Sequence, residues 1–341
     1  MAKQKKQLSI GVIGLGGIGQ GTIRLCPQLD YFNLVAGADP SPKALDQAAE
    51  VLAPEALFTD YRTMLQEVAP DMVFIATPNA FHAPAAIAAM EAGCDVMCEK
   101  PMADSLAAAK RIHQASLKTG KKFMIGQNQR FRLDTAWLRA RIEEGVLGEI
   151  YALHTRWLRR HPYTEGMWFR EKALSGGGPL IDLGVHVMDM ALWLAGFPEP
   201  QRICAQAGQR LIASGDVEDW AFAMVRLAGG GTLTCEVMEK GFIDQEVIQV
   251  EIRGTKGGVM IDGNAGTTIF STQEGAPVDL KPRLDPDHGG ARERELNNFA
   301  EWVLFDKAPR VPVEQSLQIQ AILEGVYRSA QQGKEIAVPA W

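Results

Sequence analysis

The sequence lacks the features that membrane-spanning, secreted and nucleic-acid-binding proteins require. No apolar run reaches the roughly 18 residues of a membrane helix, and residues 1–7 lack the apolar stretch of a secretory signal. The net charge is −6, and the basic cluster at residues 3–6 is typical of a solvated tail. We therefore expect no nucleic-acid partner and no membrane association.

Cysteine is scarce as well. The five cysteines are odd in number and form no C-x-x-C pair, so the sequence predicts neither a disulfide framework nor a zinc knuckle. Because the absence of a disulfide framework is typical of a reducing compartment, we expect a cytoplasmic protein.

The 341 residues exceed the usual size of one hydrophobic core, which predicts two domains. Before residue 127, short apolar runs without strict alternation are separated by helical patterns. Such runs are typical of a parallel sheet covered by helices on both faces, so we predict a doubly wound α/β domain. The expected strands are Leu8–Ile13, Leu34–Ala38, Met72–Ala76, Asp95–Cys98 and Lys122–Gly126, and the expected helices are Ile18–Leu25, Ala80–Ala92 and Ser105–Thr119.

The pattern changes after this domain. From Gln201 to about Phe270 the chain is mostly strand with glycine turns, and residues 223–237 read as a β-hairpin. This pattern predicts an α+β domain with a large, open, mainly antiparallel sheet. Because helices on one side leave the other face bare, we expect a homo-oligomer that covers it. The other expected elements are a strand at Glu149–Leu158 and helices at Thr135–Glu144, Arg292–Leu304 and Glu314–Ser329.

A glycine-rich turn joins the first expected strand to the first helix. Residues 14–19 form G-x-G-x-x-G, and Asp39 follows about 20 residues later at the end of the second strand. Gly14 permits the tight turn, Gly16 lets a pyrophosphate approach the backbone, and Gly19 allows close helix–strand packing. The phosphates would lie at the helix N-terminus. This context predicts a dinucleotide site, the alternative being a βαβ unit that binds nothing.

Asp39 favours NAD over NADP. A carboxylate suits the hydroxyls of the adenosine ribose, whereas a 2′-phosphate beside it is repelled by about 4 kcal/mol per unit charge at about 4 Å. Lys43 is close enough in sequence to soften this preference, so NADP stays possible. Asp39 could also be the N-cap of a helix that begins near Pro40, a role compatible with ribose binding.

Three features have the residue types that hydride chemistry needs. Lys100, in the turn 99–101, follows one expected strand, and residues 77–79, with His82 after them, follow the preceding strand. The carboxyl ends of such strands are where open α/β sheets bind ligands. Asp182 and His186 have the i, i+4 spacing that places both on one helix face, after glycines 176–178 that would let substrate approach.

Each feature also has a plain structural interpretation. The turn at residue 100 could be solvated, Asp182 and His186 could be a helix-stabilising pair, and His82 could be a buried imidazole with its hydrogen bonds satisfied. Asp182 and His186 could also be half of a metal site. No third ligand with suitable spacing follows, so we predict no metal.

Taken together, these segments resemble the Gfo/Idh/MocA oxidoreductases, the superfamily of glucose–fructose oxidoreductase and inositol dehydrogenase. The resemblance implies a dinucleotide-binding Rossmann domain over residues 1–127. It implies a substrate-binding and oligomerisation α+β domain over 128–341, with dimers or tetramers formed through its sheet. The matching segments, in order, are Gly14–Gly19, Asp39, Ala76–Asn79 with His82, Glu99–Pro101, Gly126–Phe131 and Gly176–His186.

The resemblance also implies site residues. Lys100, Asp182 and His186 match the family's catalytic positions. The expected cofactor contacts are Gly14, Gly16, Gly17, Ile18, Gly19, Asp39, Thr77, Pro78, Asn79, His82, Glu99, Lys100, Asn128, Trp168 and Arg170. The expected substrate contacts are Lys100, Arg156, Trp168, Asp182 and His186.

These expectations describe an NAD(P)-dependent dehydrogenase that oxidises a secondary ring hydroxyl of a sugar or cyclitol. The residues alone allow Lys100 and His186 to exchange the roles of base and oxyanion stabiliser, and the resemblance favours His186 as base, oriented by Asp182. The segment 154–163 is rich in side chains that bind hydroxyls and stack on sugar rings, but its arginines could equally bind phosphate or pair with carboxylates. The alternatives are an NAD-dependent glycoside hydrolase of the same fold and a ligand-sensing regulator without turnover.

Overall fold

The computed structural model describes residues 7–163, 166–283 and 289–341, and the chain divides into two compact units. One unit comprises Met1–Gly126 with Arg292–Ser316, and the other Gln127–Ala291 with Leu317–Trp341. A segment near the C-terminus thus packs with the N-terminal unit, which a single division at residue 127 does not include. Which unit binds which molecule stays a prediction.

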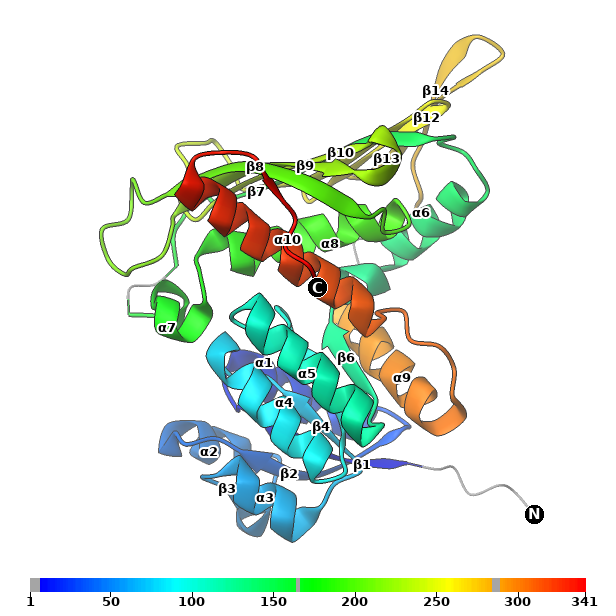
Figure 1. Cartoon of the computed structure of the whole chain (residues 1–341). Coiled ribbons are helices and arrows are strands. Elements are labelled where there is room, and N and C mark those ends of the chain that lie inside the picture. The colour runs from blue at the N-terminus through cyan, green and yellow to red at the C-terminus, as the bar shows by residue number, and fades with distance from the viewer. Residues whose placement is uncertain (1–6, 164–165, 284–288) are drawn as a thin grey trace, which may run out of the picture. The chain divides into compact units, whose positions relative to one another are not determined.

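The first unit is built on a six-stranded sheet of order β3-β2-β1-β4-β5-β6 in which every neighbouring pair is parallel (Figure 1). This confirms the predicted doubly wound sheet. Its strands are β1 (Leu8–Ile13), β2 (Phe32–Ala38), β3 (Leu57–Phe58), β4 (Met72–Ile75), β5 (Asp95–Glu99) and β6 (Phe123–Gly126). Its helices are α1 (Gly17–Leu25), α2 (Pro42–Ala48), α3 (Tyr61–Val68), α4 (His82–Glu91), α5 (Leu106–Thr119) and α9 (Gly289–Phe305).

The strand order reverses between β1 and β4. The chain steps from β1 to β2 and β3 in one direction and from β4 to β5 and β6 in the other. Because the crossovers between parallel strands are right-handed, the helices of the two halves cover opposite faces of the sheet. The carboxyl ends of β1 and β4 are therefore adjacent at the point where sheets of this order bind dinucleotides.

The second unit contains a nine-stranded sheet of order β14-β13-β12-β11-β7-β10-β9-β8-β15. Only β7 and β10 pair in parallel, so the prediction of a mainly antiparallel sheet is confirmed. The strands are β7 (Ile150–Leu158), β8 (Pro200–Gly208), β9 (Trp220–Leu227), β10 (Thr232–Met238), β11 (Val247–Gly254), β12 (Gly257–Asp262), β13 (Gly266–Gln273), β14 (Ala276–Leu280) and β15 (Ile336–Ala337). The predicted hairpin is the pair β9–β10, whose turn contains Gly229 and Gly230 with positive φ.

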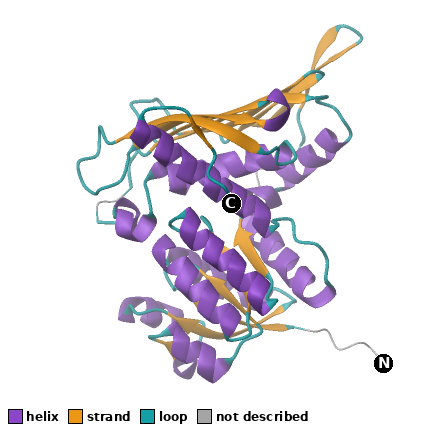
Figure 2. Ribbon diagram, viewed as in Figure 1, coloured by secondary structure: helices purple, strands orange, loops and turns teal. Residues whose placement is uncertain are grey.

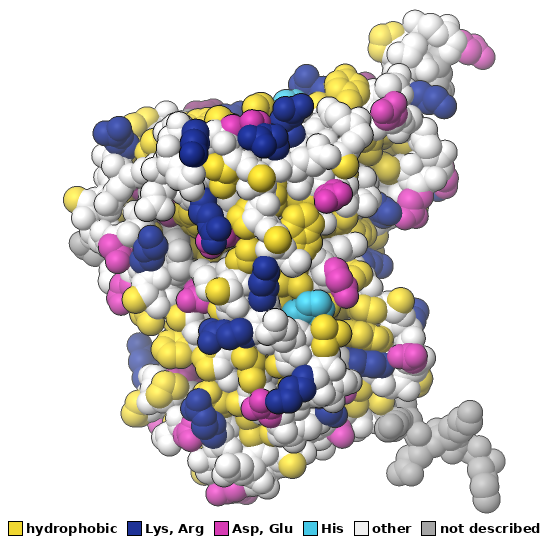
Figure 3. Space-filling view, viewed as in Figure 1, with side chains coloured by type: hydrophobic (Ala, Val, Ile, Leu, Met, Phe, Trp, Pro, Cys, Tyr) yellow, Lys and Arg dark blue, Asp and Glu magenta, His cyan; other side chains and the backbone are white. Residues whose placement is uncertain are grey.

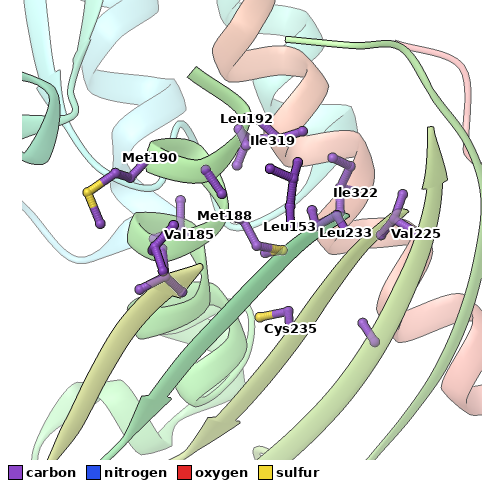
Figure 4. Close-up of a cluster of buried hydrophobic side chains, with 14 of the residues drawn as sticks. Leu153, Val185, Met188, Met190, Leu192, Val225, Leu233, Cys235, Ile319 and Ile322 are labelled. Atoms are coloured by element: carbon purple, nitrogen blue, oxygen red, sulfur yellow. The ribbon is translucent and has the colours of Figure 1, made fainter. Parts of the chain in front are cut away.

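Helices lie on one face of this sheet (Figures 1 and 2). They are α6 (Leu133–Glu143), the short α7 (Lys172–Ser175), α8 (Val185–Leu194) and the part of α10 (Val313–Gln332) that belongs to this unit. Alternate strand residues such as Leu153, Val225 and Leu233 meet Met188 of α8 and Ile322 of α10 in one apolar core (Figure 4). This alternation is what half-buried strands require.

The other face of the sheet is uncovered in the single chain. Its central strands form a concavity of about 630 Å³ whose lining includes Arg156, Phe222 and Met224. Phe222 and Met224 on β9 and Phe270 on β13 are each 43% exposed, which is unusual for large apolar side chains in a sheet.

Acidic, basic and hydrophobic side chains are interspersed on the face of the molecule drawn in Figure 3. None of the helices in the described part of the chain is long and apolar enough to cross a membrane.

Candidate active site

The glycine-rich turn of the first unit has the geometry of a dinucleotide cradle. Gly14 has φ +88°, and a Cβ on it would lie 2.6 Å from the carbonyl oxygen of Ala76. A Cβ on Gly19 would lie 1.9 Å from the carbonyl oxygen of Gly14, so the first and third glycines are required by packing. Gly16 and Gly17, at the start of α1, face open space. The turn is thus close-packed on one side and open on the other, which fits NAD.

Asp39 holds this turn in place. Its Oδ2 accepts a hydrogen bond from the backbone N–H of Leu15 at 2.7 Å, and its Oδ1 accepts one from Ser41 at 2.8 Å. The N-cap of α2 is Ser41, whose hydroxyl accepts from the N–H of Ala44, so the alternative role of Asp39 as N-cap is wrong. Each carboxylate oxygen retains a second lone pair for a ribose hydroxyl.

Thr77 and His82 occupy the adjacent strand end in different ways. The Thr77 hydroxyl is a buried oxygen with no hydrogen-bond partner among the described residues, which suits a ligand at the switch point. His82 is fully buried, with Nδ1 2.9 Å from the carbonyl oxygen of Pro101 and Nε2 3.0 Å from that of Thr77. His82 therefore links the two turns after β4 and β5. This geometry favours the structural interpretation over a direct cofactor contact. Pro78 and the buried Asn79 follow Thr77 at this strand end.

The carboxylate of Glu99 stabilises the turn that contains Lys100. The Glu99 carboxylate is 8% exposed, accepts the backbone N–H of Lys100 at 3.2 Å and pairs with the guanidinium of Arg292 at the start of α9. Glu99 thus supports the lysine turn in this structure, and its predicted cofactor contact stays untested. The pairing of Arg292 with Glu99 gave no signal in the sequence, because the two residues are 193 positions apart.

In the second unit, Asp182 and His186 lie on a helical segment that begins with a π-helical turn (Leu180–Gly184). The N–H of Val185 donates to the carbonyl oxygen of Leu180, five residues earlier, and α8 continues from there. Such π turns recur at functional sites. Asp182 and His186 are each 9% exposed, so the segment places an acid and an imidazole near the boundary of the protein interior.

Two aromatic residues complete this group. The ring of Trp157 on β7 lies 5.5 Å from the imidazole of His186, centroid to centroid. The Tyr163 hydroxyl donates a hydrogen bond to Oδ2 of Asp182. Both residues belong to the segment 154–163, which the sequence singled out, but their individual roles were not predicted.

Two of the three glycines before Asp182 make room for other parts of the protein, and the approach of substrate to this segment stays a prediction. A Cβ on Gly177 would lie 2.0 Å from the hydroxyl oxygen of Tyr327, and one on Gly178 would lie 2.0 Å from the backbone oxygen of Glu218. The Glu218 carboxylate accepts from the N–H groups of Gly178 at 2.9 Å and Leu180 at 3.1 Å and from the Tyr327 hydroxyl at 3.0 Å. Glu218 thereby caps the helical segment from a distant loop. Desolvation raises the pKa of both Glu218 and Tyr327.

Arg156, expected to contact substrate, lies elsewhere. Its Nε donates to Glu236 at 2.8 Å, and both side chains line the concavity on the uncovered face. Its neighbour Trp157 contacts His186 on the other face, because successive strand residues point to opposite sides. Arg156 is therefore not placed in the group around His186 in the single chain, and its substrate contact stays a prediction.

Trp168, Arg170 and Asn128 were expected to contact cofactor. Trp168 stacks on Phe169 with ring centroids 4.0 Å apart. Arg170 is 7% exposed, and its guanidinium donates to Glu239, to Ser214 and to the backbone oxygen of Tyr163. Asn128 accepts from Gln129 at 3.4 Å. Arg170 thus joins three separate segments of the second unit through hydrogen bonds.

The comparisons with known proteins agree with this geometry. A parallel sheet with a glycine-rich turn at its switch point defines a dinucleotide-binding protein. Residues 8–127 match the model described as "Oxidoreductase family, NAD-binding Rossmann fold", and residues 139–338 match "Oxidoreductase family, C-terminal alpha/beta domain". The chain belongs to the Gfo/Idh/MocA oxidoreductase family, whose Rossmann domain binds NAD.

Individual relatives match over most of their length. D-glucoside 3-dehydrogenase of Escherichia coli strain K12 is 31% identical, covering 98% of this chain and 99% of that protein. Levoglucosan dehydrogenase of Pseudarthrobacter phenanthrenivorans is 29% identical, over 75% of this chain and 74% of that protein. A solved structure of levoglucosan dehydrogenase in complex with NADH shares the fold with a TM-score of 0.89 at 24% identity, covering 98% of this chain and 100% of that one.

The buried His82 predicts a pH dependence of stability. Burial lowers the pKa of His82 below its usual 6.5, so the unfolded chain binds this proton more readily than the folded protein. The contribution of neutral His82 to the free energy of unfolding is therefore complete above about pH 6.5. It decreases as pH falls below that value, by up to about 1.4 kcal/mol per pH unit.

Urea denaturation between pH 7.5 and 5 checks this prediction. His82→Gln should flatten the slope over that range, although the variant is less stable at pH 7.5. His161→Gln, at an exposed histidine, is the control and should leave the slope unchanged. A His82→Gln slope equal to that of the unmodified protein would contradict the prediction.

Proposed function

We propose that this protein is an NAD-dependent dehydrogenase that oxidises a secondary ring hydroxyl of a sugar or cyclitol. The main supporting observation is the placement of Asp182 and His186 at a π-helical turn beside two aromatic side chains. Aromatic side chains stack on sugar rings, and imidazole is the side-chain group whose ordinary pKa of about 6.5 lets it accept protons near neutral pH. The carbohydrate substrates in the names of the two dehydrogenases above support the same class of substrate.

The reaction removes a proton from the hydroxyl oxygen and a hydride from the carbon that bears it, leaving a carbonyl group. NAD, when bound, accepts the hydride. We assign the proton to His186, and Asp182 orients the imidazole and stabilises its charged form. Lys100 is assigned to the reacting oxygen, where its ammonium group stabilises developing negative charge.

A screen of sugars, glycosides and cyclitols with NAD and NADP tests this proposal directly. Absorbance of the reduced cofactor should rise with at least one ring-hydroxyl substrate. Cleavage of a glycoside without net NADH would instead identify a hydrolase that recycles its hydride. Binding of a sugar without either reaction would identify a regulator.

The cofactor preference depends on Asp39. NAD should be used with a higher kcat/KM than NADP, because a 2′-phosphate beside this carboxylate is repelled. Asp39→Ala also removes two backbone hydrogen bonds of the turn, which affects both cofactors alike. The ratio of the two kcat/KM values is therefore the measurement, and it should fall in the variant. Equal or better use of NADP by the unmodified protein would disprove the assignment.

The catalytic assignment predicts a loss of turnover. His186→Ala and Lys100→Ala should each lower kcat by roughly 10²-fold or more, the scale of a general base or an oxyanion stabiliser. In His186→Ala, NAD affinity should change far less than kcat, because His186 is not among the expected cofactor contacts. A structural Asp–His pair would instead give a lower Tm with near-normal kcat. Steady-state kinetics and a thermal melt on each variant distinguish the two, and retention of most of kcat in both would refute the site.

We also propose that a second copy of the chain covers the uncovered sheet face, giving a dimer or tetramer. Light scattering at micromolar concentration should report that assembly. Phe222→Asp places a charge on this face and should shift the protein toward monomer. Phe242→Asp, at a side chain that is 88% exposed outside the strands, is the matched control and should not. A monomeric unmodified protein would overturn this proposal.

A further inference from the structure

We propose that Tyr163 is a positioning residue for the reaction, which acts by fixing the carboxylate of Asp182 that orients His186. The inference rests on the function proposed above and adds to it a residue outside the expected site. The hydroxyl of Tyr163 donates to Oδ2 of Asp182, and Asp182 is 9% exposed. A donor fixed on one oxygen restricts rotation of the carboxylate about its last side-chain bond.

Two neighbouring side chains pack against the ring of Tyr163. The guanidinium carbon of Arg159 lies 4.1 Å from the ring centroid, and the ring of Phe169 stacks on that of Tyr163 at 5.0 Å with an interplanar angle of 19°. Phe169 in turn stacks on Trp168. These successive contacts restrict movement of the Tyr163 ring and so of its hydroxyl group beside Asp182.

The backbone of Tyr163 is fixed as well. Its N–H donates to Oε1 of Glu239 at 3.2 Å, and its carbonyl oxygen accepts from Nη2 of Arg170 at 2.8 Å. Glu239 and Arg170 form an ion pair at 2.7 Å whose side chains are 3% and 8% exposed. A buried ion pair therefore holds both backbone polar groups of the residue whose side chain reaches Asp182. Such contacts hold the Tyr163 hydroxyl in a fixed position, and a catalytic site requires its groups to be held within a small range of positions.

The hydroxyl remains a donor over the working pH range. Burial and the neighbouring Asp182 carboxylate raise the pKa of Tyr163, so the phenol stays protonated. Tyr163 is therefore a permanent hydrogen-bond donor to the carboxylate that the proposed function assigns to orient His186.

Tyr163→Phe tests this role, because it removes the hydroxyl and keeps the stack. We expect kcat to fall roughly 10-fold or more while KM changes less than about threefold, since the lost contact orients a reacting group and does not hold substrate. Thr267→Val is the matched control. It also removes a hydroxyl donor from a buried carboxylate of the second unit, that of Asp134, which keeps its two hydrogen bonds from Arg132. Both variants should lose a similar few degrees of Tm, but Thr267→Val should keep kcat.

A double-mutant cycle separates positioning from general destabilisation. If Tyr163 acts through Asp182, then Tyr163→Phe should cause no further loss of kcat in an Asp182→Asn background. Independent multiplication of the two losses, or an unchanged kcat in Tyr163→Phe, overturns the inference while the proposed function stands. Equal losses of kcat in Tyr163→Phe and Thr267→Val overturn it too. Unmodified protein that reduces no cofactor with any ring-hydroxyl substrate removes the proposed function and the positioning role together.

Discussion

The ion pair between Arg130 and Asp189 is the constraint on which the second unit depends. Arg130 donates from Nε and Nη2 to the two carboxylate oxygens at 2.8 and 2.6 Å, and the two side chains are 0% and 1% exposed. The guanidinium carbon also lies 4.9 Å from the ring centroid of Phe197. Removing one partner of such a pair leaves an uncompensated buried charge and costs about 3–5 kcal/mol. Because Asp189 follows His186 by three residues on α8, the pair fixes the rotation of the helix that presents the imidazole.

That rotational constraint matters because α8 has little amphipathic preference of its own. All but one of its residues are buried, and a helix that is apolar on all sides gains nearly the same hydrophobic energy in several rotations. Polar contacts therefore set the orientation. Arg130 pairs with Asp189 in the middle of α8, Glu218 caps the segment at Gly178 and Leu180, and Trp157 packs on His186 from the sheet. The site is a consequence of specific buried polar groups more than of apolar packing.

The sequence predicts those parts of the molecule that local rules determine. The parallel strands, the glycine turn, Asp39 and the position of Lys100 after β5 follow from short patterns with physical reasons, and the structure has each of them at the expected strand end. The group around Asp182 was predicted only in part, because Tyr163, Glu218 and Tyr327 reach it from three separate segments. The separation of Arg156 from this group has a different cause. Strand alternation puts Trp157 beside His186 and its neighbour on the opposite face, and one residue of register decides between them.

Each of the two helices nearest the C-terminus stabilises one functional turn, α9 in the first unit and α10 in the second. Arg292 of α9 pairs with Glu99 beneath the Lys100 turn, and Tyr327 of α10 donates to Glu218 at the start of the Asp182 segment. In both cases a late helix supplies a donor to a largely buried carboxylate, and that carboxylate accepts backbone N–H groups of the functional turn. Burial of either carboxylate without its hydrogen-bond donor would destabilise the folded protein. The functional turns of both units are therefore completed only when the last part of the chain has folded onto them, although every expected catalytic residue precedes it in sequence.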